Sequence, residues 1–210
     1  CFNDDPDGQN GKAIVGTVSG TSISFGTATE FETGYFAYPT ITFDSNANKV
    51  VIAYYDFGAS AYAIVGTVSG TSISFGSKAT IRSGSTNSFA SCFDSSNNKI
   101  IITYSIDDGT GYGALVVGTV SGTSITLGTA VVFNSGSTAQ KSLSYDPDVN
   151  KVVISFRDTS NSSKMTYLFA TISGTTATFS STTVSDLTDS RAISSVYDPD
   201  SSSVLVFFTN

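Results

Sequence analysis

The chain has no histidine and no tryptophan, and glutamate occurs only twice, as Glu30 and Glu32. Without histidine it cannot form a Ser-His-Asp triad or a conventional zinc site. It also lacks the loops G-x-G-x-x-G and G-x-x-x-x-G-K that hold phosphates. Glu30 and Glu32 lie two residues apart, and we read them as a solvated strand end rather than a glycosidase pair. We therefore expect a protein that is not an enzyme.

Charge is also scarce, at 13% of residues, and the net charge is −7. The ten basic residues are scattered singly, which argues against a nucleic-acid partner. No apolar run approaches the ~20 residues that span a bilayer, so we expect no membrane span. The 210 residues are 40% hydrophobic, enough for one domain with a buried core.

Only two cysteines are present, and they say little about redox compartment. Cys92 stands where other repeats carry Thr42, Ser144 and Val196, so we expect a small buried side chain. The chain opens with Cys1 rather than methionine, and we expect processing or excision from a longer chain. Whether Cys1 carries lipid or a disulfide is left open by the sequence.

What the chain does contain is repetition. The segment AIVGTVSGTSISFG occupies Ala13–Gly26 and returns unchanged at Ala63–Gly76, with diverged copies at Val116–Gly128 and Leu168–Ser180. A second motif, FDSNANKVVIAYYD from Phe43, also has four copies about 50 residues apart.

Each period contains four segments rich in Val, Ile, Thr, Tyr and Phe, separated by turns of Gly, Asn, Asp and Ser. Val-Ser-Gly-Thr-Ser predicts a tight hairpin with Gly at a positive φ. We expect Gly26 and Gly76, which follow the second strand of this hairpin, to mark β-bulges.

Four-stranded units of ~50 residues are typical of an all-β fold, the β-propeller. The predicted single domain, 1–210, has repeats at 36–81, 87–133 and 139–185. A composite fourth blade would join 13–31 to 190–208, closing the ring through N- and C-terminal half-blades. Two alternatives remain: a window cut from a longer array, and a β fold other than a propeller.

Calcium is the one cofactor that the sequence suggests. Asp5, Asp7 and Asn10 lie in a loop longer than its counterparts, and oxygen ligands at such spacing suit Ca²⁺. Asp44 and Asp146 begin similar D-x-N-x-N and D-x-D-x-N patterns, which we read instead as turns stabilised by the aspartate side chain.

A recurring acid ends the second strand of each repeat. Asp56, Asp108 (or Asp107) and Asp158 would form a ring on one face, where each could contact a sugar; the competing interpretation is a strand-terminating turn. Asn161 begins the only sequon that we identify for N-glycosylation, Asn161-Ser162-Ser163.

The GTVSGTSISFG…FDSNANKVVIAY repeat resembles tandem repeats of tail-fibre-like and secreted surface proteins of phages and bacteria, over nearly the whole chain. The resemblance implies an extracellular, cell-surface or virion-surface protein with a structural or adhesive role, self-associating into an oligomer or fibre. It transfers no catalytic residue. The alternative function is a lectin with one surface-glycan site per blade.

Overall fold

The computed structural model describes residues 1–4, 9–58, 60–186 and 189–209, and these contain β-strands but no helix. The predicted all-β class is therefore confirmed. In chain order the strands are β1 (Phe2–Asp4), β2 (Asn10–Ala13), β3 (Gly16–Ser19), β4 (Ser22–Phe25), β5 (Thr29–Glu32), β6 (Phe36–Asp44), β7 (Lys49–Asp56), β8 (Ser60–Ser69), β9 (Ser72–Phe75), β10 (Ala79–Ser83), β11 (Thr86–Asp94), β12 (Lys99–Ile106), β13 (Tyr112–Ser121), β14 (Ser124–Leu127), β15 (Val131–Asp146), β16 (Lys151–Asp158), β17 (Lys164–Ser173), β18 (Thr176–Phe179), β19 (Thr183–Val184), β20 (Arg191–Asp198) and β21 (Ser203–Thr209).

Three antiparallel sheets share one strand order. The first full sheet runs β6-β7-β8-β10, with β9 paired to the far end of β8. The second full sheet contains β11, β12, β13 and the start of β15, with β14 on β13. The third contains the rest of β15, β16 and β17, with β18 and β19 on β17. The long strand β15 thus joins two sheets.

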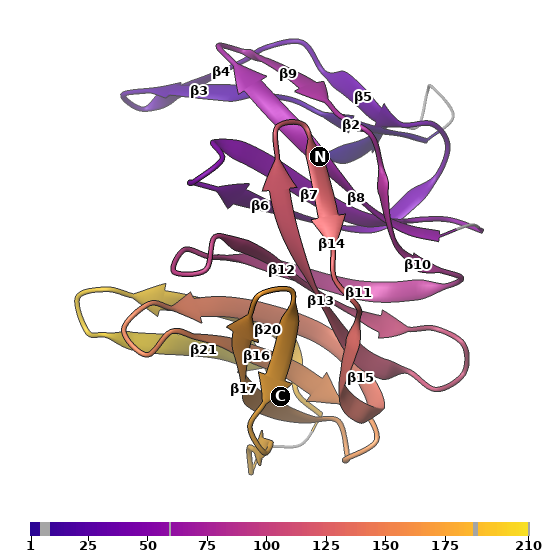
Figure 1. The fold of residues 1–210 in the computed structure, drawn as a ribbon, viewed down its shortest axis with the longest axis vertical. Helices are drawn as coiled ribbons and strands as arrows, with labels where there is room; N and C mark the ends of the chain where they lie inside the picture. Colours follow the sequence, from indigo (N-terminus) through magenta and orange to yellow (C-terminus); the bar gives the residue numbers. More distant parts are fainter. Residues whose placement is uncertain (5–8, 59, 187–188, 210) are drawn as a thin grey trace.

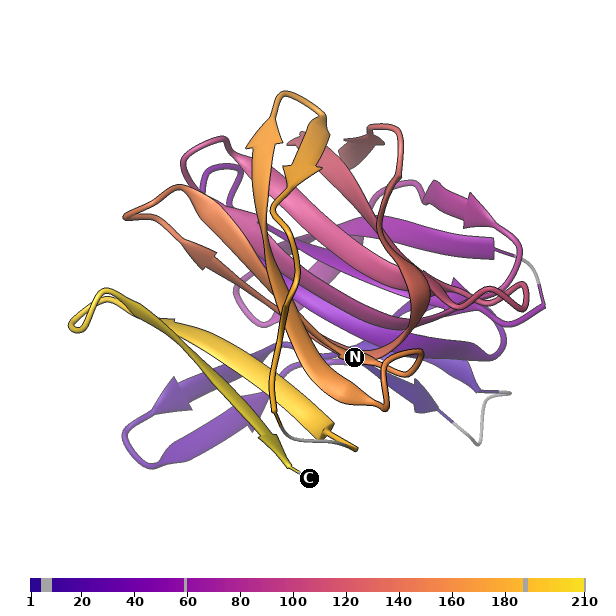
Figure 2. The same cartoon turned by 90° about the horizontal axis from the view of Figure 1, so that it is seen from below.

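The chain also has a partial sheet toward each terminus. The N-terminal sheet is β1-β2-β5, and the separate hairpin β3–β4 lies between β2 and β5 in the chain. The C-terminal hairpin, β20–β21, pairs only within itself among the described strands. These five layers stack in chain order: the N-terminal sheet lies at the top, and the C-terminal hairpin lies in the lower part, at the height of the third full sheet (Figure 1). Seen from below, successive layers cross at an angle (Figure 2).

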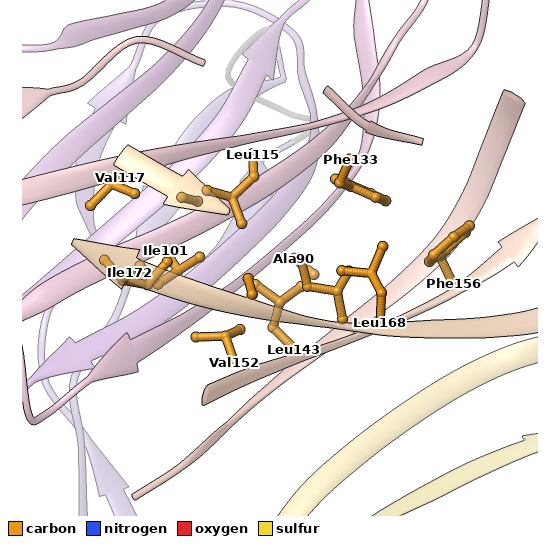
Figure 3. Close-up of a cluster of buried hydrophobic side chains, with 13 residues drawn as sticks. Ala90, Ile101, Leu115, Val117, Phe133, Leu143, Val152, Phe156, Leu168 and Ile172 are labelled. Carbon is orange, nitrogen blue, oxygen red and sulfur yellow. The ribbon is translucent and has the colours of Figure 1, made fainter. Parts of the chain in front are cut away.

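The middle strand of each full sheet is a continuous apolar run because sheets cover both of its faces. In β7, for example, Val51 faces the second full sheet while Ile52 faces the N-terminal sheet, and both are buried. One apolar cluster fills each of the three gaps from the N-terminal sheet to the third full sheet. The cluster between the second and third full sheets contains Leu115 and Phe133 from one sheet and Leu143 and Leu168 from the other (Figure 3).

The first turn of each full sheet is held by an aspartate, as predicted. The carboxylate oxygen of Asp44 accepts hydrogen bonds from the Asn46 and Ala47 amides, at 3.0 and 2.8 Å. The same bond to the amide two residues on recurs in the turns that begin at Asp94, Asp146 and Asp198. The aspartates thus act as turn residues.

The Val-Ser-Gly-Thr-Ser hairpin also forms as predicted, with Gly20 and Gly70 both at φ 59°. The predicted bulge at Gly26 and Gly76 is wrong. These glycines instead let the next layer approach, because a Cβ at Gly26 would collide with the Thr71 carbonyl oxygen and one at Gly76 with that of Thr123. Sequence periodicity carries no information about such contact between layers.

A two-residue bulge recurs in the first strand of each full sheet and of the C-terminal hairpin. The pairing of β15 with β16, for instance, shifts between Ala139 and Ser142, and Gln140 has a φ of 43°. Comparable shifts occur in β6, β11 and β20. The residues with positive φ in these other bulges are Tyr38, Ser88 and Ala192.

The predicted composite blade does not form. No sheet is closed, and among the described residues no strand of the C-terminal hairpin pairs with the N-terminal sheet. The edge of β2 that would receive β21 is occupied by β1, whose residue Phe2 pairs with Lys12. The two partial sheets lie toward opposite ends of the stack (Figure 1), so half-blades of one chain do not meet.

Candidate functional site

The predicted calcium loop is only partly visible. Asp5 and Asp7 lie outside the described residues. Asn10 is at the start of β2, where its side-chain nitrogen donates to Glu30 at 2.8 Å and its side-chain oxygen accepts the Gly34 amide at 2.7 Å. Within the described part of the chain, no three His, Cys, Asp or Glu side chains form a group that would hold a metal.

Two of the three acids predicted to form a ring, Asp108 and Asp158, accept hydrogen bonds within turns. The Asp108 carboxylate accepts the Thr110 amide and hydroxyl and lies 3.2 Å from Arg82, and the bonds from Thr110 lower the pKa of Asp108. Asp158 accepts the Ser160 amide at 3.1 Å. Asp56 is half-buried at the end of β7, where burial raises its pKa, with a smaller contribution from Glu32.

Asn161 lies in the exposed turn between β16 and β17. Its backbone amide donates to Asp158 and its carbonyl accepts from Lys164, both at 3.1 Å, which leaves the side chain at the surface. A glycan on Asn161 therefore stays a prediction.

Glu32 departs from the expected solvated strand end. It is buried, whereas Glu30 is exposed, because the pairing of β2 with β5 shifts between these two residues. Its carboxylate accepts the Tyr54 hydroxyl at 2.6 Å and the Lys78 ammonium at 2.8 Å. Burial and then the Glu32 hydrogen bond raise the pKa of Tyr54 well above its usual range. This cluster ties the N-terminal sheet to the first full sheet.

Lys141 is a second buried charge that the sequence did not reveal. It belongs to the bulge of β15, at the position that Phe89 and Ile193 take in neighbouring layers. Its ammonium group donates to the Ser88 carbonyl oxygen at 3.3 Å and to the Ser105 hydroxyl. Both partners are uncharged, and burial lowers the pKa of Lys141 to about 7.

The outer face of the C-terminal hairpin is apolar and uncovered. Val196, Leu205 and Phe207 are 54%, 39% and 59% exposed. The residues at the same register positions in the full sheets face the next layer and are at most 8% exposed: Thr42, Val51, Ala53, Ile101, Thr103, Ser144, Val153 and Ser155. Cys92, the remaining member of this set, is half-buried, and burial raises the pKa of its thiol.

The opposite end of the stack exposes a second apolar set. Ile41 and Phe43 of β6 are 52% and 54% exposed, whereas in later layers their equivalents contact the preceding layer. Ile14 is 38% exposed, although its equivalents Ile64, Val116 and Leu168 are at most 3% exposed. Ile14 also follows the end of β2 at Ala13, where the corresponding strand of each full sheet continues.

A cavity of about 460 Å³ lies beside the edge of β21 that pairs with no described strand. Tyr167 and Phe169 of β17 line it on one side, with ring centroids 5.9 Å apart, and Val204 and Val206 of β21 on the other. Asp146 also lines the cavity. In the full sheets, the third strand occupies the place beside the equivalent of β21.

These uncovered ends form the candidate site. Sequence reasoning missed it, although one signal was present: Val196 is apolar where other repeats carry Thr42 and Ser144. Compared with known proteins, the chain matches no family model and no curated protein. Within the described residues there is also no helix that is long and apolar enough to cross a membrane.

Proposed function

We propose that this protein is a non-catalytic structural and adhesive subunit of an extracellular, cell or virion surface, which associates with itself into an oligomer or fibre. The observation that carries this proposal is the pair of uncovered apolar ends, each resembling one side of the contacts between internal layers. A repeating stack that ends in two such faces favours addition of further layers from other molecules. The finer architecture that we propose is a β-propeller-like arrangement completed between chains.

Sedimentation velocity over a range of protein concentrations, together with negative-stain electron microscopy, tests this proposal. We expect oligomers whose size grows with concentration. Because each chain carries a net charge of −7, added salt should weaken mutual repulsion and favour association. A single monomeric species at every concentration and salt level would contradict self-association.

The second candidate function is a lectin. The cavity beside β21 favours it, because Tyr167 and Phe169 offer aromatic surface next to the hydroxyls of Ser202 and Ser203 and the carboxylate of Asp146. A glycan array with calcium present tests this function, and Tyr167→Ala should remove any binding. An array that stays blank would contradict it.

A further inference from the structure

The geometry points to one occupant for the cavity beside β21: the segment Ala13–Gly16 of a second copy of this chain, which follows the part of β2 that β1 already pairs with. We propose that this segment pairs with β21 as a third strand, so that the C-terminal hairpin of one copy completes the N-terminal sheet of the next. This inference rests on the proposed self-association and names its interface.

Backbone pairing gives the first argument. Strands β7, β12 and β16 pair on both edges, whereas β21 pairs on one edge only among the described residues. Ile14, Val15 and Gly16 are the counterparts of residues that pair with the second strand in the first full sheet. In the N-terminal sheet that strand position is filled only by β1, opposite Asn10–Lys12. The C-terminal hairpin therefore lacks a third strand, and the segment Ile14–Gly16 lacks the second strand with which its counterparts pair. Pairing this segment with β21 by strand addition would supply both.

The fit of side chains gives the second argument. Counterparts of Ile14 pack against the third strand of the preceding layer; Leu168, for example, shares a cluster with Leu115 and Val117. At the C-terminal end, Tyr167 and Phe169 occupy the positions of Leu115 and Val117 and line the cavity. Ile14 of a second copy would therefore fill the cavity with apolar volume while its backbone pairs with β21.

The first strands of successive layers give a third, independent argument, because their contacting residues match in polarity. Thr42 meets Ser91 between the first and second full sheets, hydroxyl to hydroxyl. At the next boundary Cys92 and Leu143 share an apolar cluster. Beyond it, Ser144 and Ser195 again form a hydroxyl pair, at 2.8 Å.

The same register assigns Val196 of one copy to Ile41 of the next. Both side chains are apolar and more than half exposed, at 54% and 52%. The proposed contact thus places an exposed valine against an exposed isoleucine. The equivalent positions form a pair of matched polarity at the three boundaries from the first full sheet to the C-terminal hairpin. A sugar in the cavity would cover neither residue and would leave the edge of β21 unpaired.

Cross-linking of the full chain tests the interface. In a Cys1→Ser background, Ile14→Cys and Val206→Cys are made in separate molecules, because the register of Ile52 with Ile64 places positions 206 and 14 opposite each other. A short thiol cross-linker should join the two variants into dimers when they are mixed, and should leave either variant alone as monomer. The Cys1→Ser protein without an added cysteine controls for Cys92.

Charge substitution supplies the second measurement. Val196→Asp should raise the dissociation constant for self-association, measured by sedimentation, at least tenfold. Val132→Asp, which changes an exposed valine outside the proposed contact, should leave this constant unchanged.

Three results would overturn the interface. Cross-linked monomers of the Ile14→Cys, Val206→Cys double variant, without mixed dimers, would show closure within one chain. Association that persists without mixed cross-links would leave self-association standing but place it on another surface. Glycan binding that depends on Tyr167, again without mixed cross-links, would make the cavity a sugar site. Absence of any association contradicts both the proposed function and this interface.

Discussion

Lys141 shows how one residue can lower stability in an otherwise apolar gap between layers. Its amine takes the position of Phe89 and Ile193 but receives only uncharged hydrogen-bond partners. Burial of a charge without an opposite charge is costly, so the neutral form is favoured in the folded protein. The pKa of Lys141, lowered from 10.5 to about 7, expresses this cost.

We therefore predict that Lys141→Met stabilises the protein at neutral pH. Because the folded-state pKa lies below the unfolded value, the folded state binds fewer protons between these two values, and stability rises with pH across this range. The gain from Lys141→Met should shrink by on the order of 3 kcal/mol between about pH 7 and about pH 9.5. Urea unfolding of both proteins at each pH measures it, and a gain independent of pH would contradict the assignment.

The Tyr54 hydroxyl leads to a second residue-level prediction. It donates to the buried Glu32 carboxylate, and hydrogen bonds to charged groups contribute more than neutral ones. Tyr54→Phe should lower the free energy of unfolding by about 2 kcal/mol. Tyr104→Phe is the matched control: it removes the hydroxyl of a tyrosine that is equally buried and stacks on Phe89, and its effect should stay below about 1 kcal/mol. Equal losses would mean that the Glu32 contact adds nothing.

At the scale of elements, the hairpins β3–β4, β8–β9 and β13–β14 end in glycines that contact the next layer. A Cβ at Gly76 would collide with the backbone of Thr123, which cannot rotate away as a side chain can. We predict that Gly76→Ala lowers the free energy of unfolding by about 2 kcal/mol, as overpacking does in cores. The exposed neighbour Ser77→Ala should change it by less than about 0.5 kcal/mol. Thermal unfolding of both variants measures these changes. If Gly76→Ala left the free energy of unfolding unchanged, this would contradict the close approach of Gly76 to Thr123.

Local elements were predictable from the sequence, and contacts between layers were not. The turns at Asp44 and Gly70 depend on a few neighbouring residues, so the pattern of letters predicts them. The burial of Glu32 depends on a shift in strand pairing, and that of Lys141 on a bulge with positive φ at Gln140. No periodic pattern encodes either feature. The composite blade failed for a similar reason: whether two chain ends meet depends on the rotation between layers, which the sequence does not display.

For the whole molecule, the association surface contains one mismatch. Ser180 stands where the preceding layers carry Gly76 and Gly128, and its hydroxyl accepts the Phe169 amide. A second copy stacked with the internal geometry would bring the carbonyl of its Thr21 against the Ser180 Cβ. This side chain should hold the hairpin of the incoming copy away and moderate the affinity.

We predict that Ser180→Gly strengthens association severalfold, by admitting the close approach that the internal glycines allow. Sedimentation equilibrium of this variant beside the unmodified chain measures the change, with Ser77→Gly as a control for adding glycine at an exposed site. Unchanged or weaker association would show that the β3–β4 hairpin does not stack on Ser180.

The two identical segments, 13–26 and 63–76, occupy different surroundings. Ile23 is 54% exposed and Ile73 is 7% exposed, although their sequence neighbours are the same. A protease that cuts at the same points within both segments releases two peptides of identical sequence and mass. In hydrogen–deuterium exchange their shared signal should split into two isotope envelopes, a fast-exchanging one from 13–26 and a slow-exchanging one from 63–76. When copies associate, the fast envelope should move towards the slow one, which makes the duplicated peptide a built-in reporter of assembly.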